Sequence, residues 1–354
     1  MAVNPVFWKG RKVLLTGHSG FKGGWLALWL RQLGAELRGF ALPPATTPSL
    51  WQAAQLDQQI TGEFADIRDA ARLSAAVQAF QPELVLHLAA QPLVRESYRA
   101  PAETYATNVM GTVNLLEAVR STDFVRAVLV VTTDKCYENH EWPWPYREQD
   151  ALGGFDPYSS SKACVELLCA SYRDSFLRAS GVALATARTG NVLGGGDWSP
   201  ERLIPDIFGA WQQGREVVLR YPHATRPWQH VLDPLMGYLQ LAQGLLTEPD
   251  RYAAAWNFGP DSAGLATVEA VVGRLAELWP GQARWSTSND AQPHEAGLLA
   301  LDSSKARQLL GWAPRWSLDT TLKRTLDWQL AWQDGRNMED VTRDQIAVHQ
   351  GEIQ

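Results

Sequence analysis

Two side chains four residues apart could together deprotonate a hydroxyl group. Tyr158 and Lys162 lie in the segment YSSSK, and on a helix this spacing brings a phenol and an ammonium group onto one face. A nearby cation favours the phenolate form, so Tyr158 could act as a general base nearer to neutral pH. An ordinary surface pair is the alternative, and the neighbouring motifs favour the catalytic interpretation.

A second group of polar residues follows an apolar run. Thr133, Asp134 and Lys135 come directly after AVLVVT (127–132), which predicts a buried strand. Open parallel sheets bind their ligands beyond the carboxyl ends of the strands, so a catalytic acid could lie here. A helix cap or a solvated loop acid is the competing interpretation of Asp134.

A glycine-rich loop predicts a dinucleotide site. Gly17, Gly20 and Gly23 follow the strand candidate 12–16 and open a helical pattern that Gly34 ends. This spacing permits a tight turn and a close approach of the backbone to a diphosphate, which then rests at the positive end of the helix. Lys162 would reach the ribose of a nicotinamide bound there.

The choice between NAD and NADP stays open on these residues. The second strand candidate, 36–42, ends without the acidic residue that often holds the ribose hydroxyls of NAD. Asp66 and Ile67, after the presumed third strand, could contact adenine. A solvated loop acid is a nearly equal alternative for Asp66.

The first half of the chain alternates strands and helices. A helix is predicted at 106–120, and apolar runs predict strands at 12–16, 36–42, 84–90, 127–132 and 182–188. This order indicates an α/β protein with a Rossmann-type, doubly wound parallel sheet.

The alternation breaks after Thr189, which predicts a smaller C-terminal α/β lobe for the substrate. We expect residues 1–190 and 231–262 to form the NAD-binding domain, and 191–230 and 263–354 to form the lobe. The polar segment from Asp334 gives no clear signal of order.

Composition excludes several classes of function. A formal net charge of -6 and a pI near 5.7 argue against nucleic acid and anionic membranes as partners, and no apolar stretch is long enough to span a bilayer. Cys136, Cys164 and Cys169 form no metal-ligand pattern. We therefore expect no metal site, and reduced thiols in a cytoplasmic protein.

Several motifs resemble the extended short-chain dehydrogenase/reductase family of NAD-dependent epimerases and dehydratases. They are TGHSGFKG (16–23), HLAA (87–90), TNVMGTVNLLEA (107–118), YSSSK (158–162) and ARTGNVLGGGD (187–197). The resemblance covers nearly the whole chain and implies the Rossmann fold with NAD as cofactor.

The resemblance also implies site residues. Those for the cofactor are Gly17, His18, Gly20, Phe21, Lys22, Gly23, Asp66, Ile67, Leu88, Ala89, Ala90, Asn108, Tyr158 and Lys162. The catalytic residues would be Thr133, Asp134, Lys135, Tyr158 and Lys162. The substrate would contact Asn191, Arg202, Leu203, Arg226, Trp228 and Glu295. Of these, the two arginines would hold the diphosphate, and Trp228 would either stack on a ring or pack in the core.

Three segments resemble one branch of the family, the CDP-glucose 4,6-dehydratases: TTDKCYEN (132–139), GGGDWSPERLIPD (194–206) and RPWQHVLDPL (226–235). This branch implies oxidation of CDP-glucose at C4, loss of water across C5 and C6, and reduction at C6 on the same NAD. Tyr158 would deprotonate the 4-hydroxyl and Asp134 would protonate the departing 6-hydroxyl. The product, CDP-4-dehydro-6-deoxyglucose, would feed deoxysugar biosynthesis, including that of lipopolysaccharide O-antigens.

Lys135 departs from the Thr-Asp-Glu triplet of related dehydratases, in which Glu removes the C5 proton. Lys135 either works as a neutral amine or stabilises the enolate while another group takes the proton. Because Asp134 has to be protonated to act as an acid, we expect it not to neutralise Lys135 by ion pairing.

Two other functions stay open. A nucleotide-sugar 4-epimerase has no use for an acid at Asp134, and a non-catalytic dinucleotide sensor has no use for the pair Tyr158 and Lys162. Incubation with CDP-glucose separates the three. The helical stretches 106–120 and 159–177 would form the four-helix contact of a homodimer that is usual in the family.

Overall fold

The computed structural model describes residues 2–288 and 297–351. Its centre is a seven-stranded sheet in which every pair of neighbouring strands is parallel. In spatial order the strands are β10 (Ala255–Phe258), β6 (Ala183–Thr189), β5 (Ala127–Val131), β4 (Leu84–His87), β1 (Lys12–Thr16), β2 (Glu36–Ala41) and β3 (Thr61–Phe64). The strand order reverses between β1 and β4, and ligands of such sheets bind in the crevice at the carboxyl ends there.

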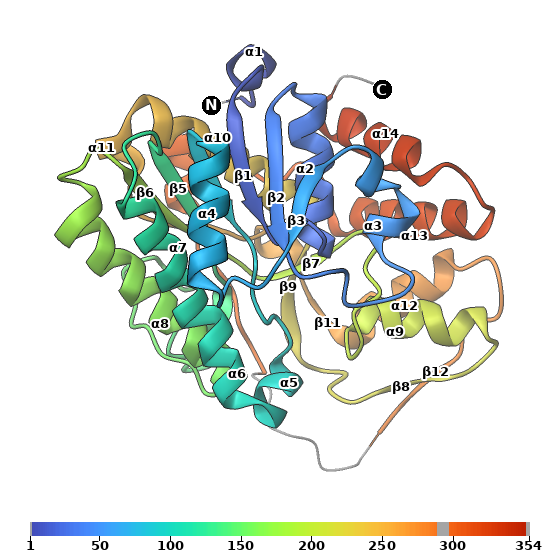
Figure 1. Ribbon diagram of the computed structural model, residues 1–354. Coiled ribbons are helices and arrows are strands. Elements are labelled where there is room, and N and C mark those ends of the chain that lie inside the picture. The colour runs from blue at the N-terminus through green and yellow to red at the C-terminus, as the bar shows by residue number, and fades with distance from the viewer. Residues whose placement is uncertain (1, 289–296, 352–354) are drawn as a thin grey trace.

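Helices cover both faces of this sheet (Figure 1). Val13 and Leu15 of β1 pack into one core with α2 (Phe21–Gln32) and α10 (Leu232–Thr247). Leu14 between them faces a second core, formed with α4 (Ala70–Phe80), α7 (Gly111–Arg120) and α8 (Pro157–Tyr172). This alternation is that of a strand buried on both sides, and it confirms the doubly wound sheet.

A smaller lobe lies beyond the carboxyl ends of the strands. It contains a three-stranded sheet in the order β11 (Leu265–Thr267), β9 (Thr225–His230) and β7 (Asn191–Leu193), and a parallel pair of β8 (Val217–Leu219) and β12 (Trp285–Thr287). Helices α9 (Leu203–Gln212), α12 (Val268–Leu278) and α13 (Leu318–Gln333) close a third core around them.

Shorter elements connect these parts. They are α1 (Pro5–Trp8), α3 (Leu50–Ala53), η1 (Leu56–Gln58), α5 (Val94–Arg99), α6 (Pro101–Tyr105), η3 (Asp134–Cys136), α11 (Pro249–Tyr252), η5 (Ser262–Gly264) and three π-helical turns, η2 (Ala106–Met110), η4 (Arg173–Leu177) and η6 (Ala306–Leu310). The predicted helix 106–120 is therefore η2 followed by α7.

The polar segment from Asp334 is ordered as α14 (Met338–Gln350). Met338, Val341 and Ile346 enter the same core as α2, so α14 packs against the Rossmann domain through α2 and not only on the lobe.

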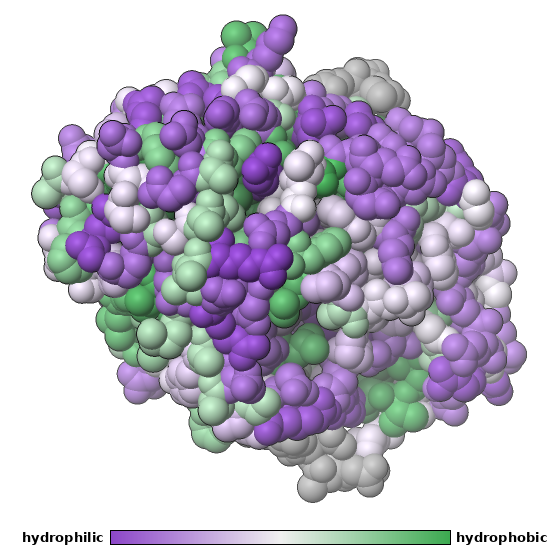
Figure 2. Space-filling model, in the orientation of Figure 1, coloured by the Kyte–Doolittle hydropathy of each residue, from purple (hydrophilic) through white to green (hydrophobic). Residues whose placement is uncertain are grey.

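Figure 2 shows a largely hydrophilic face on which hydrophobic residues form scattered groups. In the described part of the chain no helix is long and apolar enough to cross a membrane, and no cluster of three His, Cys, Asp or Glu side chains could hold a metal ion.

Candidate active site

One cavity of about 1040 Å³ lies at the carboxyl ends of the strands and extends into the lobe. The glycine loop, the ends of β3, β4 and β5, the start of α8, and β7 to β9 all contribute to its wall. Most of the predicted cofactor, catalytic and substrate residues therefore line a single space, whose volume is at the upper end of the range for small-molecule sites.

The glycine loop leaves no room for side chains. Gly17 has φ of 78°, and a Cβ there would lie 2.7 Å from the backbone nitrogen of Ala89. A Cβ at Gly23 would lie 1.9 Å from the carbonyl oxygen of Gly17. Helix α2 begins at Phe21 without a side-chain cap, so its first N–H groups face the cavity wall that Phe21 and Lys22 form. Such an uncapped, glycine-lined helix end fits a diphosphate.

His18 does not line this cavity, contrary to the expected cofactor contact. Its ring is buried against β2 and β3, where a Cβ at Gly39 would lie 2.4 Å from it, and it stacks on Phe64. Burial lowers the pKa of His18 to about 4, so the ring is neutral at pH 7. The His18 ring packs beneath the glycine loop, in space that is free because Gly39 and Gly62 on the two strands have no side chains.

Tyr158 and Lys162 occupy the first two turns of α8. Asp156 caps the helix by accepting from the backbone N–H of Ser159 at 2.9 Å. Burial raises the pKa of Tyr158 to about 12, and a hydrogen bond with the Thr133 side chain opposes this. The Lys162 ammonium donates to the carbonyl oxygen of Val131 at 3.1 Å. Burial lowers the pKa of Lys162 to about 8, and the charge of Glu166 opposes this.

Asp134 lines the cavity, and one of its carboxylate oxygens has no hydrogen-bond partner in the described residues. The side chain is 1% exposed. Its Oδ1 accepts from the Thr133 hydroxyl at 3.0 Å, whereas Oδ2 has no partner and faces Gly190, at which a Cβ would lie 2.8 Å from it. A buried carboxyl group with a vacant hydrogen-bonding position is suited to protonate a bound ligand.

Lys135 lies beside this carboxylate. Its Nζ is 3.7 Å from Asp134 Oδ1, and its side chain is 30% exposed. The expectation that the two residues do not pair is therefore wrong. Both residues belong to the short helix η3, whose N-cap Thr133 accepts from the Lys135 N–H at 3.4 Å.

The predicted substrate residues come from the lobe. Asn191, Arg202, Leu203, Arg226 and Trp228 all line the cavity. Arg202 pairs with Asp197 at 3.0 Å. Trp228 is anchored in the third core, where its Nε1 donates to the carbonyl oxygen of Ala266 at 2.9 Å, so core packing accounts for most of its ring. Glu295 lies outside the described residues.

Two comparisons with known proteins show the family. The family model for GDP-mannose 4,6 dehydratase matches residues 14–325. A CDP-glucose 4,6-dehydratase of Salmonella typhimurium is 48% identical over 95% of both chains. The chain belongs to the nucleotide-sugar 4,6-dehydratase family. This makes it an enzyme, a hydro-lyase.

More distant 4,6-dehydratases and their structural neighbours share the whole fold. A dTDP-glucose 4,6-dehydratase of Xanthomonas campestris is 28% identical over 90% of this chain and 92% of its own. The structure of MoeE5 in complex with UDP-glucuronic acid and NAD superposes with a TM-score of 0.77 at 25% identity, over 91% of this chain and 99% of that one. DesIV, a dTDP-glucose 4,6-dehydratase of Streptomyces venezuelae, has a TM-score of 0.79 at 23% identity, over 93% and 99%.

Asn108 does not line the cavity, contrary to the expected cofactor contact, whereas its neighbour Thr107 does. Asn108 is 1% exposed and joins three segments: its Oδ1 accepts from the Gln91 N–H at 2.8 Å, and its Nδ2 donates to Ser161 Oγ at 2.9 Å. Its side chain thus ties η2 to α8 rather than contacting the predicted ligand.

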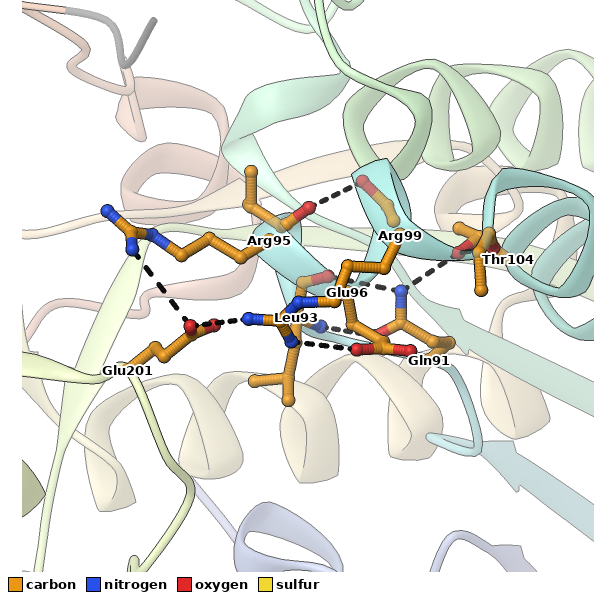
Figure 3. A network of polar contacts seen from close by, with 10 residues as sticks. Gln91, Leu93, Arg95, Glu96, Arg99, Thr104 and Glu201 are labelled. Atoms are coloured by element: carbon orange, nitrogen blue, oxygen red, sulfur yellow. Dashed lines mark hydrogen bonds and ion pairs between the residues drawn. The ribbon is translucent and has the colours of Figure 1, made fainter. Parts of the chain in front are cut away.

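Sequence reasoning missed an ionic contact in the cavity wall. Arg95 and Arg99 on α5 face Glu201 of the loop before α9, with Arg99 Nη2 at 2.7 Å from its carboxylate (Figure 3). Arg95 and Glu201 also line the cavity. No motif marks these residues, because the contact joins positions about a hundred residues apart.

Proposed function

We propose that this chain converts CDP-glucose into CDP-4-dehydro-6-deoxyglucose and water, with NAD as a bound cofactor that is restored in each turnover. The observation that carries the proposal is the buried Asp134 carboxylate with its unpartnered oxygen, in one cavity with Tyr158 and the glycine loop. The choice of CDP-glucose follows the 48% identical relative, since cytosine is not readable from the cavity chemistry alone.

The cavity wall fits the dinucleotide. Gly17, Gly20, Phe21, Lys22 and Gly23 would hold its diphosphate, Asp66 and Ile67 its adenosine, and the strand end Leu88, Ala89 and Ala90 its central part. Tyr158 and Lys162 would contact the nicotinamide ribose. When bound, NAD supplies a hydride acceptor at C4 of the sugar and the donor for C6.

Tyr158 acts as the base on the sugar 4-hydroxyl. Burial alone disfavours its phenolate, so the fold has to supply compensation. The Thr133 hydroxyl provides it by hydrogen bonding and Arg202 by its positive charge. Lys162 lies one turn along α8 from Tyr158.

Asp134 and Lys135 together carry the proton that the elimination needs. In the ion pair the two side chains share one transferable proton, which is on the Lys135 ammonium group. Moving that proton to Asp134, over a distance of 3.7 Å between the two side chains, creates the acid for the 6-hydroxyl and the neutral amine for the C5 proton at once. Elimination then takes the proton from Asp134 and returns one to Lys135, so the pair ends as it began. The pairing that contradicted our expectation is thus compatible with both roles.

Incubation with CDP-glucose and NAD tests the proposal. Formation of a 4-keto sugar, which absorbs strongly in the ultraviolet after alkali, supports dehydration. Conversion to CDP-galactose would indicate a 4-epimerase instead, and no change would leave a dinucleotide sensor. Parallel incubations with dTDP-, GDP- and UDP-glucose test the choice of base, and CDP-glucose is expected to turn over fastest.

The two parts of the fold divide the ligands. We infer that residues 1–190 and 231–262 bind NAD, and that 191–230 and 263–354 bind the sugar nucleotide, with α14 as a structural exception. This division is supported by β10, which completes the main sheet, and by the lobe residues Asn191, Arg202 and Arg226 in the cavity. The three unpaired cysteines suit a cytoplasmic enzyme.

We also infer a homodimer through the helices that start at η2 and α8. Met110, Leu167 and Phe176 on these helices are exposed apolar side chains, which is the composition of a contact surface. Leu167→Glu should shift the mass measured by light scattering from dimer to monomer. An unchanged mass would place the contact elsewhere.

A further inference from the structure

A buried carboxylate lies one helical turn from Lys162, outside the cavity. Glu166 on α8 is 4% exposed and accepts three hydrogen bonds. Thr186 Oγ1 donates at 2.7 Å and Arg188 Nη2 at 2.8 Å, both to Oε2, and Thr132 Oγ1 donates to Oε1. None of Glu166, Thr186 and Arg188 lines the cavity, whereas Thr132 does. The carboxylate therefore connects the sheet interior to the wall of the site.

The two oxygens of Glu166 have different partners. Oε2 is fixed to β6 by Thr186 and Arg188. Arg188 is itself held, because its Nη1 donates to the Tyr137 hydroxyl at 2.7 Å and to the Glu148 carbonyl oxygen at 3.2 Å. The Glu166 carboxylate is therefore fixed in place through Oε2, and its other oxygen, Oε1, accepts the hydrogen bond from Thr132.

Thr132 stands between the groups that the reaction uses. The carbonyl oxygen of Val131, just before it, accepts from Lys162. Thr133, just after it, hydrogen-bonds with Tyr158 and donates to Asp134 Oδ1 at 3.0 Å. A rotation of the chain at Thr132 would displace all three contacts together.

We propose that Glu166 is a positioning residue of the dehydratase, which sets the geometry of Thr133, Asp134 and Lys162 through its hydrogen bond to Thr132 and provides the buried counter-charge of Lys162. The inference rests on the proposed function. Glu166 touches neither the predicted substrate nor the cofactor site, so its effect has to pass through these contacts.

The groups around Lys162 leave Glu166 as its acidic partner. Cys169 on the same helix, Cys136 on η3, His87 on β4 and Lys22 on α2 also interact with it. Burial raises the pKa of both thiols and lowers that of His87 to about 3, so these three groups are neutral at pH 7. Lys22 repels Lys162. Loss of the Glu166 charge should therefore lower the pKa of Lys162, which burial already places at about 8.

Two matched variants test the positioning. Thr132→Val and Thr186→Val each remove one hydroxyl group that donates to the Glu166 carboxylate. In Thr186→Val the affected oxygen, Oε2, still accepts from Arg188. We expect Thr132→Val to lower kcat by about 100-fold, the loss typical of reacting groups misplaced by about 1 Å, with an unchanged KM. Thr186→Val should stay within about threefold of wild type, and both should keep the wild-type Kd for NAD. Equal kcat values in the two variants would overturn the proposal.

Glu166→Gln tests the charge. The alkaline limb of its kcat profile should move to lower pH by about one unit, the size of shift that a neighbouring opposite charge produces. Glu166→Gln alone leaves the buried Arg188 charge without its partner, so the double variant Glu166→Gln/Arg188→Met removes both charges together. Glu166→Asp keeps the negative charge and should restore the wild-type limb in part. An unmoved limb in a folded variant would refute the counter-charge. Failure of the wild type to form any keto sugar would instead refute the proposed function.

Discussion

Replacing Lys135 by Met should stop the reaction between oxidation and elimination. Tyr158 and Lys162 are untouched by the change, so the 4-ketone still forms. The C5 proton then has no acceptor. Asp134 also loses its proton donor, the Lys135 ammonium group 3.7 Å from its carboxylate. The variant should accumulate bound NADH, visible by its near-ultraviolet absorbance, and release no 6-deoxy product.

The size of the effect follows from two independent considerations. A general base contributes about 100- to 10,000-fold, or roughly 3 to 5 kcal/mol of barrier. The Coulomb interaction of two unit charges 3.7 Å apart, the separation of Lys135 from Asp134, is also about 4.5 kcal/mol in an effective dielectric near 20. Loss of Lys135 would thus raise the barrier by about the same amount whether Lys135 is the base or the cation that stabilises the enolate. The rate alone does not distinguish these two roles.

Lys135→Arg is the control that separates the two roles, because a guanidinium keeps its positive charge and does not give up its proton. Single-turnover mixing in deuterated solvent should show NADH accumulation in both variants and no deuterium at C5. Rapid entry of deuterium at C5 in Lys135→Met, or turnover restored by Arg, would show that Lys135 is not the base.

Three further changes have distinct signatures. Tyr158→Phe should lose at least about 100-fold in turnover while its calorimetric Kd for NAD stays near wild type, and more than about a tenth of wild-type turnover would exclude Tyr158 as the base. Asp134→Asn should form the 4-ketone and stall like Lys135→Met, which steady NADH absorbance after mixing would show; free release of product would contradict the acid role. Burial lowers the pKa of Lys22 to about 7, so its positive charge is present below and lost above that pH. NAD affinity should therefore weaken by up to about tenfold for each pH unit above 7, and Lys22→Met should bind more weakly with no such dependence in calorimetry.

Much of the fold could be predicted because local patterns and tertiary structure agree. Apolar runs such as 127–131 are buried on both faces, and the glycines at 17 and 23 occur where only glycine fits. The order of α14 could not be predicted, since Met338, Val341 and Ile346 are few apolar residues in a polar segment. Their burial depends on the surface that α2 offers from more than three hundred residues away.

The site shows the same division. Tyr158, Lys162 and Asp134 could be predicted because they lie in short motifs beside strand ends. The burial of His18 away from the cavity depends on Gly39 and Gly62 in other strands. The hydrogen bond between Glu166 and Thr132 joins α8 to the residue that follows β5. The spacing of residues along the chain does not contain these contacts.

The central claim is that one bound cofactor carries the hydrogen from C4 to C6 of the same sugar. The direct measurement is turnover of a mixture of CDP-glucose deuterated at C4 and unlabelled CDP-glucose, followed by mass and NMR analysis of the product. The account predicts deuterium at C6, in the molecules that began with it at C4. Loss of the label to solvent, its appearance in free NADH, or its transfer to unlabelled sugar would contradict the account.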